Sequence, residues 1–162
     1  MGAEKAVEDG LIPLLQYVKT KQALDLYRMS TSAPTTLTKL DNYWFVGAPG
    51  TGKSRSARER WPVHFNKSCN KWWDGYRNED TILIDDLDRQ RTAISHDLKL
   101  WADHYPFKAE SKGSCSSIRP GRIVVTSNYT ISELFETDQE LVRALQRRFN
   151  IVRFESLFCI KH

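Results

Sequence analysis

The stretch GAPGTGKS, from Gly47 to Ser54, decides the expected fold, because it fills every fixed position of the phosphate-loop pattern G-x-x-x-x-G-K-[ST]. Glycine adopts the backbone angles that let a loop turn successive N–H groups toward phosphate oxygens. Lys53 is expected to reach the β- and γ-phosphates of ATP, and the Ser54 hydroxyl to ligate Mg²⁺. The predicted nucleotide-binding residues are Gly47, Ala48, Pro49, Gly50, Thr51, Gly52, Lys53 and Ser54.

The flanks of this loop supply the context that the motif requires. The apolar run Tyr43–Val46 predicts a strand before the loop, and the sequence KSRSARERW after it is compatible with a helix whose N-terminal dipole faces the phosphates. Within that helix, Arg58 and Arg60 are interpreted as solvated charges. Two more apolar runs, Ile82–Ile84 and Ile123–Val125, have the composition of strands in a parallel sheet that helices cover on both faces.

Helical segments alternate with these strands. The spacing of apolar residues predicts a helix within about Thr92–Asp103, and two capping-box patterns, Thr130–Glu133 and Thr137–Glu140, indicate helix starts further on. Strands alternating with helices around a phosphate loop predict an α/β fold of the P-loop NTPase class.

Polar residues follow two of the predicted strands. Asp85 and Asp86 come directly after Ile82–Ile84, and Asn128 follows Ile123–Val125 at a distance of a few residues. Ligands of open α/β sheets gather at the carboxyl ends of the strands, so these side chains are expected beside the phosphate loop. Asp85 suits Mg²⁺ binding together with Ser54, Asp86 suits deprotonation of an attacking water, and Asn128 suits a hydrogen bond to the γ-phosphate. Hydrolysis is therefore favoured over binding alone.

Composition limits the organisation of the chain. Its 162 residues, 40% apolar, suffice for one core and a small appendage. Three widely spaced cysteines indicate neither a disulfide framework nor a zinc site. No apolar run reaches the roughly 18 residues of a membrane span, and no leader peptide is apparent, so a soluble intracellular protein is expected. The net charge of +4 names no partner by itself.

The chain before the phosphate loop has a different pattern. Apolar residues at helical spacing predict helix from Ala3 to Met29 with a break near Thr20, and the Ser/Thr/Pro-rich segment Ser30–Thr38 predicts a linker. We therefore expect a helical oligomerisation region and linker at 1–38 and an ATPase domain at 39–162.

Five segments in order carry a family resemblance: GAPGTGKS, NKWWDGY from Asn70, ILIDD, YPFKAESKG from Tyr105, and IVVTSN. Together they resemble the superfamily-3 helicase domain of replication-associated (Rep) proteins of circular single-stranded DNA viruses, and circovirus Rep in particular, over about Trp44 to Phe154. The resemblance implies an AAA+-type ATPase whose hexameric ring translocates along single-stranded DNA, in the host nucleus.

The resemblance also implies roles for residues outside the phosphate loop. In the family a loop carries a basic residue into the central channel, and the matching position is Lys112 beside Gly113. A neighbouring subunit supplies an arginine to the hydrolysis site, for which Arg148 is the expected residue and Arg147 the fallback. A full Rep protein carries a nicking nuclease with a His-hydrophobe-His motif. No such motif occurs here, so the nuclease domain is an expected partner and no strand cleavage by this chain is expected.

Two other functions remain open from the residues. Nucleotide kinases are similarly short and share the phosphate loop, although the acidic and amide strand ends suit water activation better than transfer to a small molecule. A nucleotide-gated DNA-binding scaffold with negligible turnover is the third possibility.

Overall fold

The phosphate-loop strand lies inside a parallel sheet, as a computed structural model of residues 14–31 and 34–155 shows. The five strands follow the order β2-β3-β6-β1-β7, and every neighbouring pair is parallel. Their bounds are β1 Asn42–Gly47, β2 Phe65–Asn66, β3 Thr81–Ile84, β6 Arg122–Ser127 and β7 Phe149–Phe154. The three strands predicted from apolar runs are therefore the three central ones.

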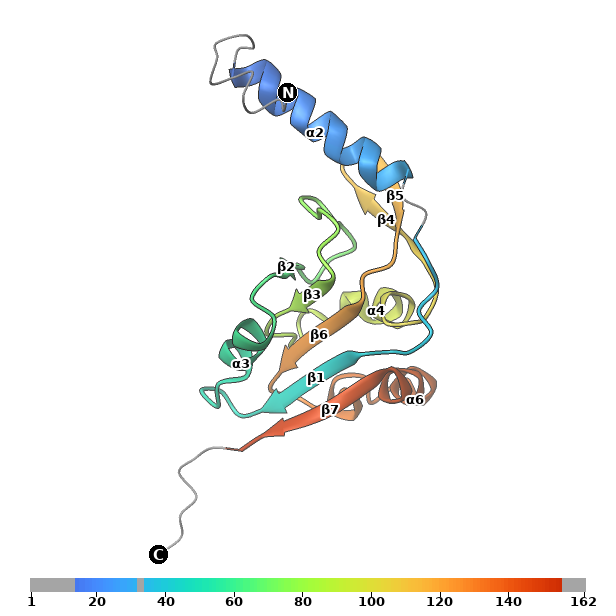
Figure 1. Ribbon diagram of the computed structural model, residues 1–162. Helices are drawn as coiled ribbons and strands as arrows, with labels where there is room; N and C mark the ends of the chain where they lie inside the picture. The colour runs from blue at the N-terminus through green and yellow to red at the C-terminus, as the bar shows by residue number, and fades with distance from the viewer. Residues whose placement is uncertain (1–13, 32–33, 156–162) are drawn as a thin grey trace, which may run out of the picture. The chain divides into compact units, whose positions relative to one another are not determined.

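Helices cover both faces of this sheet. Helix α3 (Lys53–Arg60) lies on one side, and α4 (Ser95–Trp101) and α6 (Gln139–Arg148) lie on the other (Figure 1). Successive side chains of each strand point to opposite faces of the sheet. Phe45, Leu83 and Val124 form a buried cluster with Ala57 of α3, whereas Trp44, on the opposite face, packs edge-on against Phe149. The predicted α/β fold, a parallel sheet covered by helices around a phosphate loop, is confirmed.

Short elements connect the strands and helices around the sheet. A 3-10 turn, η1 (Thr92–Ile94), leads into α4, so the helix predicted within Thr92–Asp103 is confirmed. Helix α5 (Ile131–Leu134) begins at Thr130 with both hydrogen bonds of the predicted capping box. The second predicted box is wrong: α6 is capped by Asp138, whose carboxylate accepts from the Leu141 N–H at 2.9 Å. An aspartate next to the threonine supplies the stronger capping group.

Two strands stand apart from the main sheet. β4 (Phe107–Ser111) and β5 (Ser114–Ile118) form an antiparallel hairpin. Ser111 pairs with Ser114, so Lys112 and Gly113 make the turn. The loop position matched to Lys112 is therefore the turn of a hairpin.

The chain divides into two compact units, 1–33 and 34–162. In the first, α2 runs without interruption from Leu14 to Thr31, so the break expected near Thr20 does not occur. The Thr20 hydroxyl donates to the carbonyl of Gln16, which accommodates it within the helix. The predicted helix before Leu14 and Cys159 lie outside the described residues.

The boundary between the units falls before the 38/39 position expected from the sequence. Leu37 belongs to the second unit, because its N–H donates to the carbonyl of His104 at 2.8 Å and its own carbonyl contacts His104 Nδ1. Among the described residues, no helix combines the length and apolar character needed to cross a membrane.

Candidate nucleotide-hydrolysis site

The phosphate loop joins the end of β1 to the start of α3. Gly50 and Gly52 have φ angles of 76° and 85°, which side chains rarely tolerate, and a Cβ added at either would meet nothing within 4 Å. These two glycines are thus required by backbone conformation. Gly47 is required by space, because a Cβ there would lie 2.4 Å from the carbonyl oxygen of Phe154 on the adjacent strand. Gly50 and its predecessors Ala48 and Pro49 remain exposed and accessible to a ligand.

Lys53 lies folded back inside this loop. Its Nζ donates to the carbonyls of Gly47 and Ala48, both at 2.8 Å, and to the amide oxygen of Asn128 at 3.0 Å. Burial lowers the pKa of Lys53, against the opposing effect of the charges on Asp86 and Asp85. The acceptors of this ammonium group are therefore neutral oxygens. A charged phosphate oxygen binds an ammonium group more strongly than they do, so a phosphate can displace them.

Asp85 lies beside α3 and contacts two residues of that helix, Ser54 and Arg58. It follows Leu83 by two residues and therefore faces α3, as Thr126 does two residues after Val124. Asp85 Oδ1 accepts from the hydroxyls of Ser54 and Thr126, each at 2.6 Å. Parallel pairing thus brings together the acid after β3 and a hydroxyl of β6.

Arg58 completes the surroundings of Asp85 and corrects a sequence-based interpretation. The sequence predicts a solvated charge at this position, but Arg58 Nη1 lies 3.0 Å from Asp85 Oδ2 and also donates to the carbonyl of Ser54. Its position four residues after Ser54, on the same helix face, is the signal that could have identified it. Arg60 is also not merely solvated, because its guanidinium stacks over the rings of Tyr43 and Trp61.

The ionisation of Asp85 follows from these contacts. Burial raises the pKa of Asp85, but hydrogen bonds from Ser54, Thr126 and Arg58 outweigh this effect, so the pKa lies below its ordinary value. The carboxylate is therefore ionised at neutral pH beside the first turn of α3.

The residues present fit a nucleotide-bound Mg²⁺. The Ser54 hydroxyl donates its hydrogen bond to Asp85, which leaves the lone pairs of the hydroxyl oxygen for a cation. Mg²⁺ commonly takes one or two protein groups and completes its shell with phosphates and water. No group of three or more His, Cys, Asp or Glu side chains occurs in the described part of the chain, so a cage made of protein alone is not formed there.

Asp86 and Asn128 flank this centre. Asp86 is exposed and has a φ of 56°, and its N–H donates to Thr126 Oγ1 at 2.8 Å. This left-handed conformation turns the chain immediately after Asp85, and aspartate is among the residues that tolerate it. Asn128 is exposed, and its contact with Lys53 uses only the amide oxygen. Its NH₂ group is left to donate to a phosphate or a water.

The predicted DNA-binding and finger residues lie elsewhere. Lys112 and Gly113 form the hairpin turn, and both are exposed. Arg148 lies at the start of the strands, the end opposite to the phosphate loop, since its carbonyl accepts from the side chain of Asn42, the first residue of β1. The structure thus groups Lys53, Ser54, Asp85, Asp86 and Asn128, and separates Lys112 and Arg148 from them.

Arg148 is engaged within its own chain. Its Nη2 lies 2.5 Å from Asp103 Oδ2, its Nη1 donates to the carbonyl of Ala144, and its side chain is 17% exposed. Burial raises the pKa of Asp103, but the hydrogen bond from Arg148 leads the contacts that bring it below its ordinary value. Arg147, the next residue back, is exposed.

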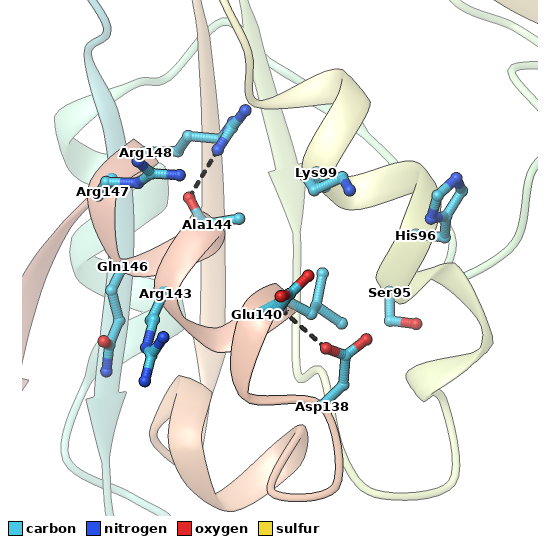
Figure 2. A pocket seen from close by; sticks show the side chains of 11 residues that line it. Ser95, His96, Lys99, Asp138, Glu140, Arg143, Ala144, Gln146, Arg147 and Arg148 are labelled. Atoms are coloured by element: carbon cyan, nitrogen blue, oxygen red, sulfur yellow. Dashed lines mark hydrogen bonds between the residues drawn. The ribbon is translucent and has the colours of Figure 1, made fainter.

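Both arginines line a groove of about 820 Å³ between α4 and α6 (Figure 2). Figure 2 shows the Arg148 side chain bonded to Ala144, and the side chains of Lys99 and Arg143 also line the groove. The groove is polar and rich in cations, although Asp138 and Glu140 stand at one end.

Comparison with known proteins agrees with this geometry. Residues 43–129, from β1 to just beyond Asn128, match the RNA helicase family. The replication-associated protein of Porcine circovirus 1 is 36% identical over 113 residues, which cover 67% of this chain and 36% of that protein. That of Canary circovirus is 36% identical over 135 residues, 83% of this chain and 46% of the relative. The chain thus spans between a third and a half of the length of these curated relatives.

Solved structures give a looser likeness. Saccharomyces cerevisiae Hsp104 in complex with ADP overlaps with a TM-score of 0.43 at 14% identity, covering 88% of this chain and 34% of that one. The family assignment rests instead on the sequence matches, and the family match at residues 43–129 spans the phosphate loop, the paired aspartates and Asn128. The chain belongs to the helicase family of circovirus-type replication-associated proteins.

Proposed function

We propose that this chain is the motor domain of a viral replication initiator, and that it hydrolyses ATP at the subunit interfaces of a hexameric ring to translocate on single-stranded DNA. The observation that supports it most directly is the convergence of three strand ends on one site: the loop after β1, Asp85 after β3 and Asn128 after β6. Binding alone needs the loop, whereas an ionised acid and an exposed amide beside it suit hydrolysis.

Each side chain has a defined task in this mechanism. Lys53 exchanges the carbonyls of Gly47 and Ala48 for the β- and γ-phosphates. Ser54, oriented by Asp85, would hold Mg²⁺, which would neutralise charge on the phosphate oxygens. Asp86 accepts the proton of the attacking water, and the Asn128 NH₂ group donates to the γ-phosphate or to that water.

A second subunit completes the site. Arg147 and Arg148 lie beyond the start of β1, and the six residues of that strand separate them from their own phosphate loop by about 17 Å. In the proposed assembly an arginine so placed serves a neighbour's nucleotide, and the head-to-tail contact gives a ring when its rotation closes. Arg148 is committed to Asp103, so we assign the finger to the exposed Arg147, which reverses the order expected from the sequence.

The proposal includes the partners implied by the relatives. The hairpin turn at Lys112 and Gly113 is the proposed contact with single-stranded DNA, a nuclease domain is the proposed companion in the whole Rep protein, and the host nucleus is the proposed compartment. The name of the matched family, RNA helicase, makes single-stranded RNA the necessary comparison in any test.

Phosphate release tests the proposal. We expect turnover that single-stranded DNA stimulates more than single-stranded RNA of the same sequence does. Lys53→Ala and Asp86→Asn should abolish it, and Lys112→Ala should remove the stimulation while basal turnover remains. Turnover that requires a small-molecule acceptor would instead identify a phosphotransferase. An assembled ring that binds nucleotide and DNA without turnover would identify a scaffold, and stronger stimulation by RNA would reassign the nucleic acid.

A further inference from the structure

The turn that carries Lys112 is not the type that a two-residue hairpin favours. Such loops prefer type I′ or II′ turns, which have a positive φ at the first central residue. Here the second central residue, Gly113, has a φ of 88°, and Lys112 is not among the residues with positive φ. The hairpin ladder by itself therefore supports this turn poorly, and support must come from another part of the chain.

That support comes from Asp74. Its Oδ1 accepts a hydrogen bond from the backbone N–H of Lys112 at 2.9 Å, across 38 residues of sequence. The ladder pairs Ser111 with Ser114 and so does not use this N–H group. A carboxylate acceptor makes the bond charge-assisted, which makes it stronger than a bond between neutral groups.

Asp74 is itself held by a firmly anchored segment. The preceding residue, Trp73, is 2% exposed, and its ring packs against Trp101 and Phe107. The Trp73 N–H donates to the carbonyl of Glu110 on β4 at 2.8 Å. On the other side, Gly75 turns the chain with a φ of 84°. The exposed Asp74 carboxylate is thus held within hydrogen-bonding distance of the hairpin turn.

The charge of Asp74 is unfavourable for the proposed task of the hairpin. A carboxylate hydrogen-bonded to the backbone of Lys112 repels the phosphate that the Lys112 ammonium would attract. A nucleic-acid contact built for electrostatics alone would have no acid at this place. An acid is useful there only as a hydrogen-bond acceptor for the backbone.

We propose that Asp74 is a positioning residue for nucleic-acid binding: it holds the Lys112–Gly113 turn in the conformation that presents Lys112 to a backbone phosphate. This inference rests on the proposed function of the hairpin. It separates two properties of one side chain, because acceptance of the hydrogen bond helps binding and the negative charge opposes it.

Substitutions at Asp74 separate the two properties. Asp74→Ala removes acceptor and charge, whereas Asp74→Asn removes the charge and keeps an acceptor oxygen. Glu110→Gln is the matched control, because it removes an exposed charge from the same hairpin, where Glu110 pairs with Lys71, and leaves the backbone bond to Trp73 in place. The whole chain is used, and the DNA concentration giving half-maximal ATPase stimulation is measured beside basal turnover.

For Asp74→Ala we expect this concentration to rise about tenfold, the equivalent of one lost charge-assisted hydrogen bond, with basal turnover unchanged. Asp74→Asn and Glu110→Gln should equal the parent or bind DNA more tightly. Equal improvement by Asp74→Ala and Asp74→Asn would overturn the inference, because Asp74 would then be only a repulsive charge. Equal loss of basal turnover in Asp74→Ala and Asp74→Asn would also overturn the inference, because Asp74 would then be needed for folding in general.

Amide hydrogen exchange at Lys112 tests the inference without relying on ATPase activity. Protection of this N–H should fall in Asp74→Ala and persist in Asp74→Asn, and unchanged protection in both would refute the positioning role. If the parent shows no stimulation by any nucleic acid, the proposed function fails. The exchange result then still decides whether Asp74 orders the turn.

Discussion

Lys53 Nζ and Asn128 Oδ1 lie 3.0 Å apart, so the cation of the phosphate loop is joined to the strand end that would sense the γ-phosphate. This hydrogen bond holds each side chain close to the position that the proposed mechanism requires. The contact also couples their substitutions, because removal of either one leaves a polar partner to rearrange.

Asn128→Ala should therefore impair the chemical step more than the binding of ATP. The variant loses a donor to the developing charge, and such losses reduce kcat by about 10²–10³. Lys53 keeps the carbonyls of Gly47 and Ala48 as partners, so affinity for a fluorescent ATP analogue should change little. Lys53→Ala is the comparison, and it should lose both affinity and turnover. Normal kcat in Asn128→Ala would remove Asn128 from the hydrolysis site.

Removal of the guanidinium from Arg58 should shift the acid limb of the pH–rate profile to higher pH. Arg58 is one of three groups whose hydrogen bonds lower the pKa of Asp85 against the effect of burial, so Arg58→Ala raises that pKa. Because the ionised carboxylate orients Ser54, activity should then fail at a higher pH than in the parent. Arg55→Ala is the control on the same helix, since Arg55 pairs with Glu59. Identical acid limbs in all three proteins would contradict the role given to Arg58.

The same shift has a consequence for folding. A carboxyl group whose pKa is lowered in the folded state stabilises the protein at pH values above its ordinary pKa of 3.8. This contribution is lost as the pH falls through the folded-state pKa. Arg58→Ala should thus reduce the free energy of unfolding at neutral pH, and the difference from the parent should shrink in acid. Urea unfolding at pH 7 and at successively lower pH measures it.

Arg148→Ala should lower the stability of the protein, whereas Arg147→Ala should lower its ATP turnover. Arg148 and Asp103 form a largely buried ion pair with side chains 17% and 27% exposed, so Arg148→Ala should lower the free energy of unfolding by about 1–3 kcal/mol. Arg147 is exposed, so its replacement should leave the melting temperature unchanged. It should instead reduce turnover in the assembled ring by about 10³ or more, the effect of losing an arginine finger. Equal turnover of Arg147→Ala and the parent would return the assignment to Arg148.

Lys67 provides a test in the alkaline range. It is 3% exposed, its ammonium lies over the ring of Trp101 at 4.7 Å, and burial lowers its pKa from 10.5 to about 8. Between these values the unfolded chain binds more protons than the folded one, so this group makes the protein more stable as the pH rises. At about 1.4 kcal/mol for each tenfold change in proton concentration, the full effect is about 3 kcal/mol.

Denaturant unfolding between pH 7 and pH 10 checks this expectation. The free energy of unfolding of the parent should rise relative to that of Lys67→Met across the interval. Lys39→Met, at an exposed position, should run parallel to the parent. A constant difference between the parent and Lys67→Met would mean that the ammonium is not destabilised by burial.

Local pattern was sufficient for much of this protein. The phosphate loop, the three apolar strands and the capping box at Thr130 each depend on residues adjacent in sequence, whose φ preferences, pleat alternation or short hydrogen bonds act within one element. The predicted grouping of Asp85 and Asn128 with the loop also held, because parallel strands carry their carboxyl ends to one edge of the sheet.

The contacts that distinguish the candidate site needed the tertiary structure. Arg58 reaches Asp85 across 27 residues, Arg148 reaches Asp103 across 45, and Asp74 reaches Lys112 across 38. A charged residue on a helix has the same sequence pattern whether it faces water or an acid. The packing of α3, α6 and the Trp73 segment determines which partner lies within hydrogen-bonding distance, and no local period encodes that distance. The amino-acid sequence thus determined the chemistry available at each strand end, and the tertiary structure decided which charges are already paired and which remain free to act.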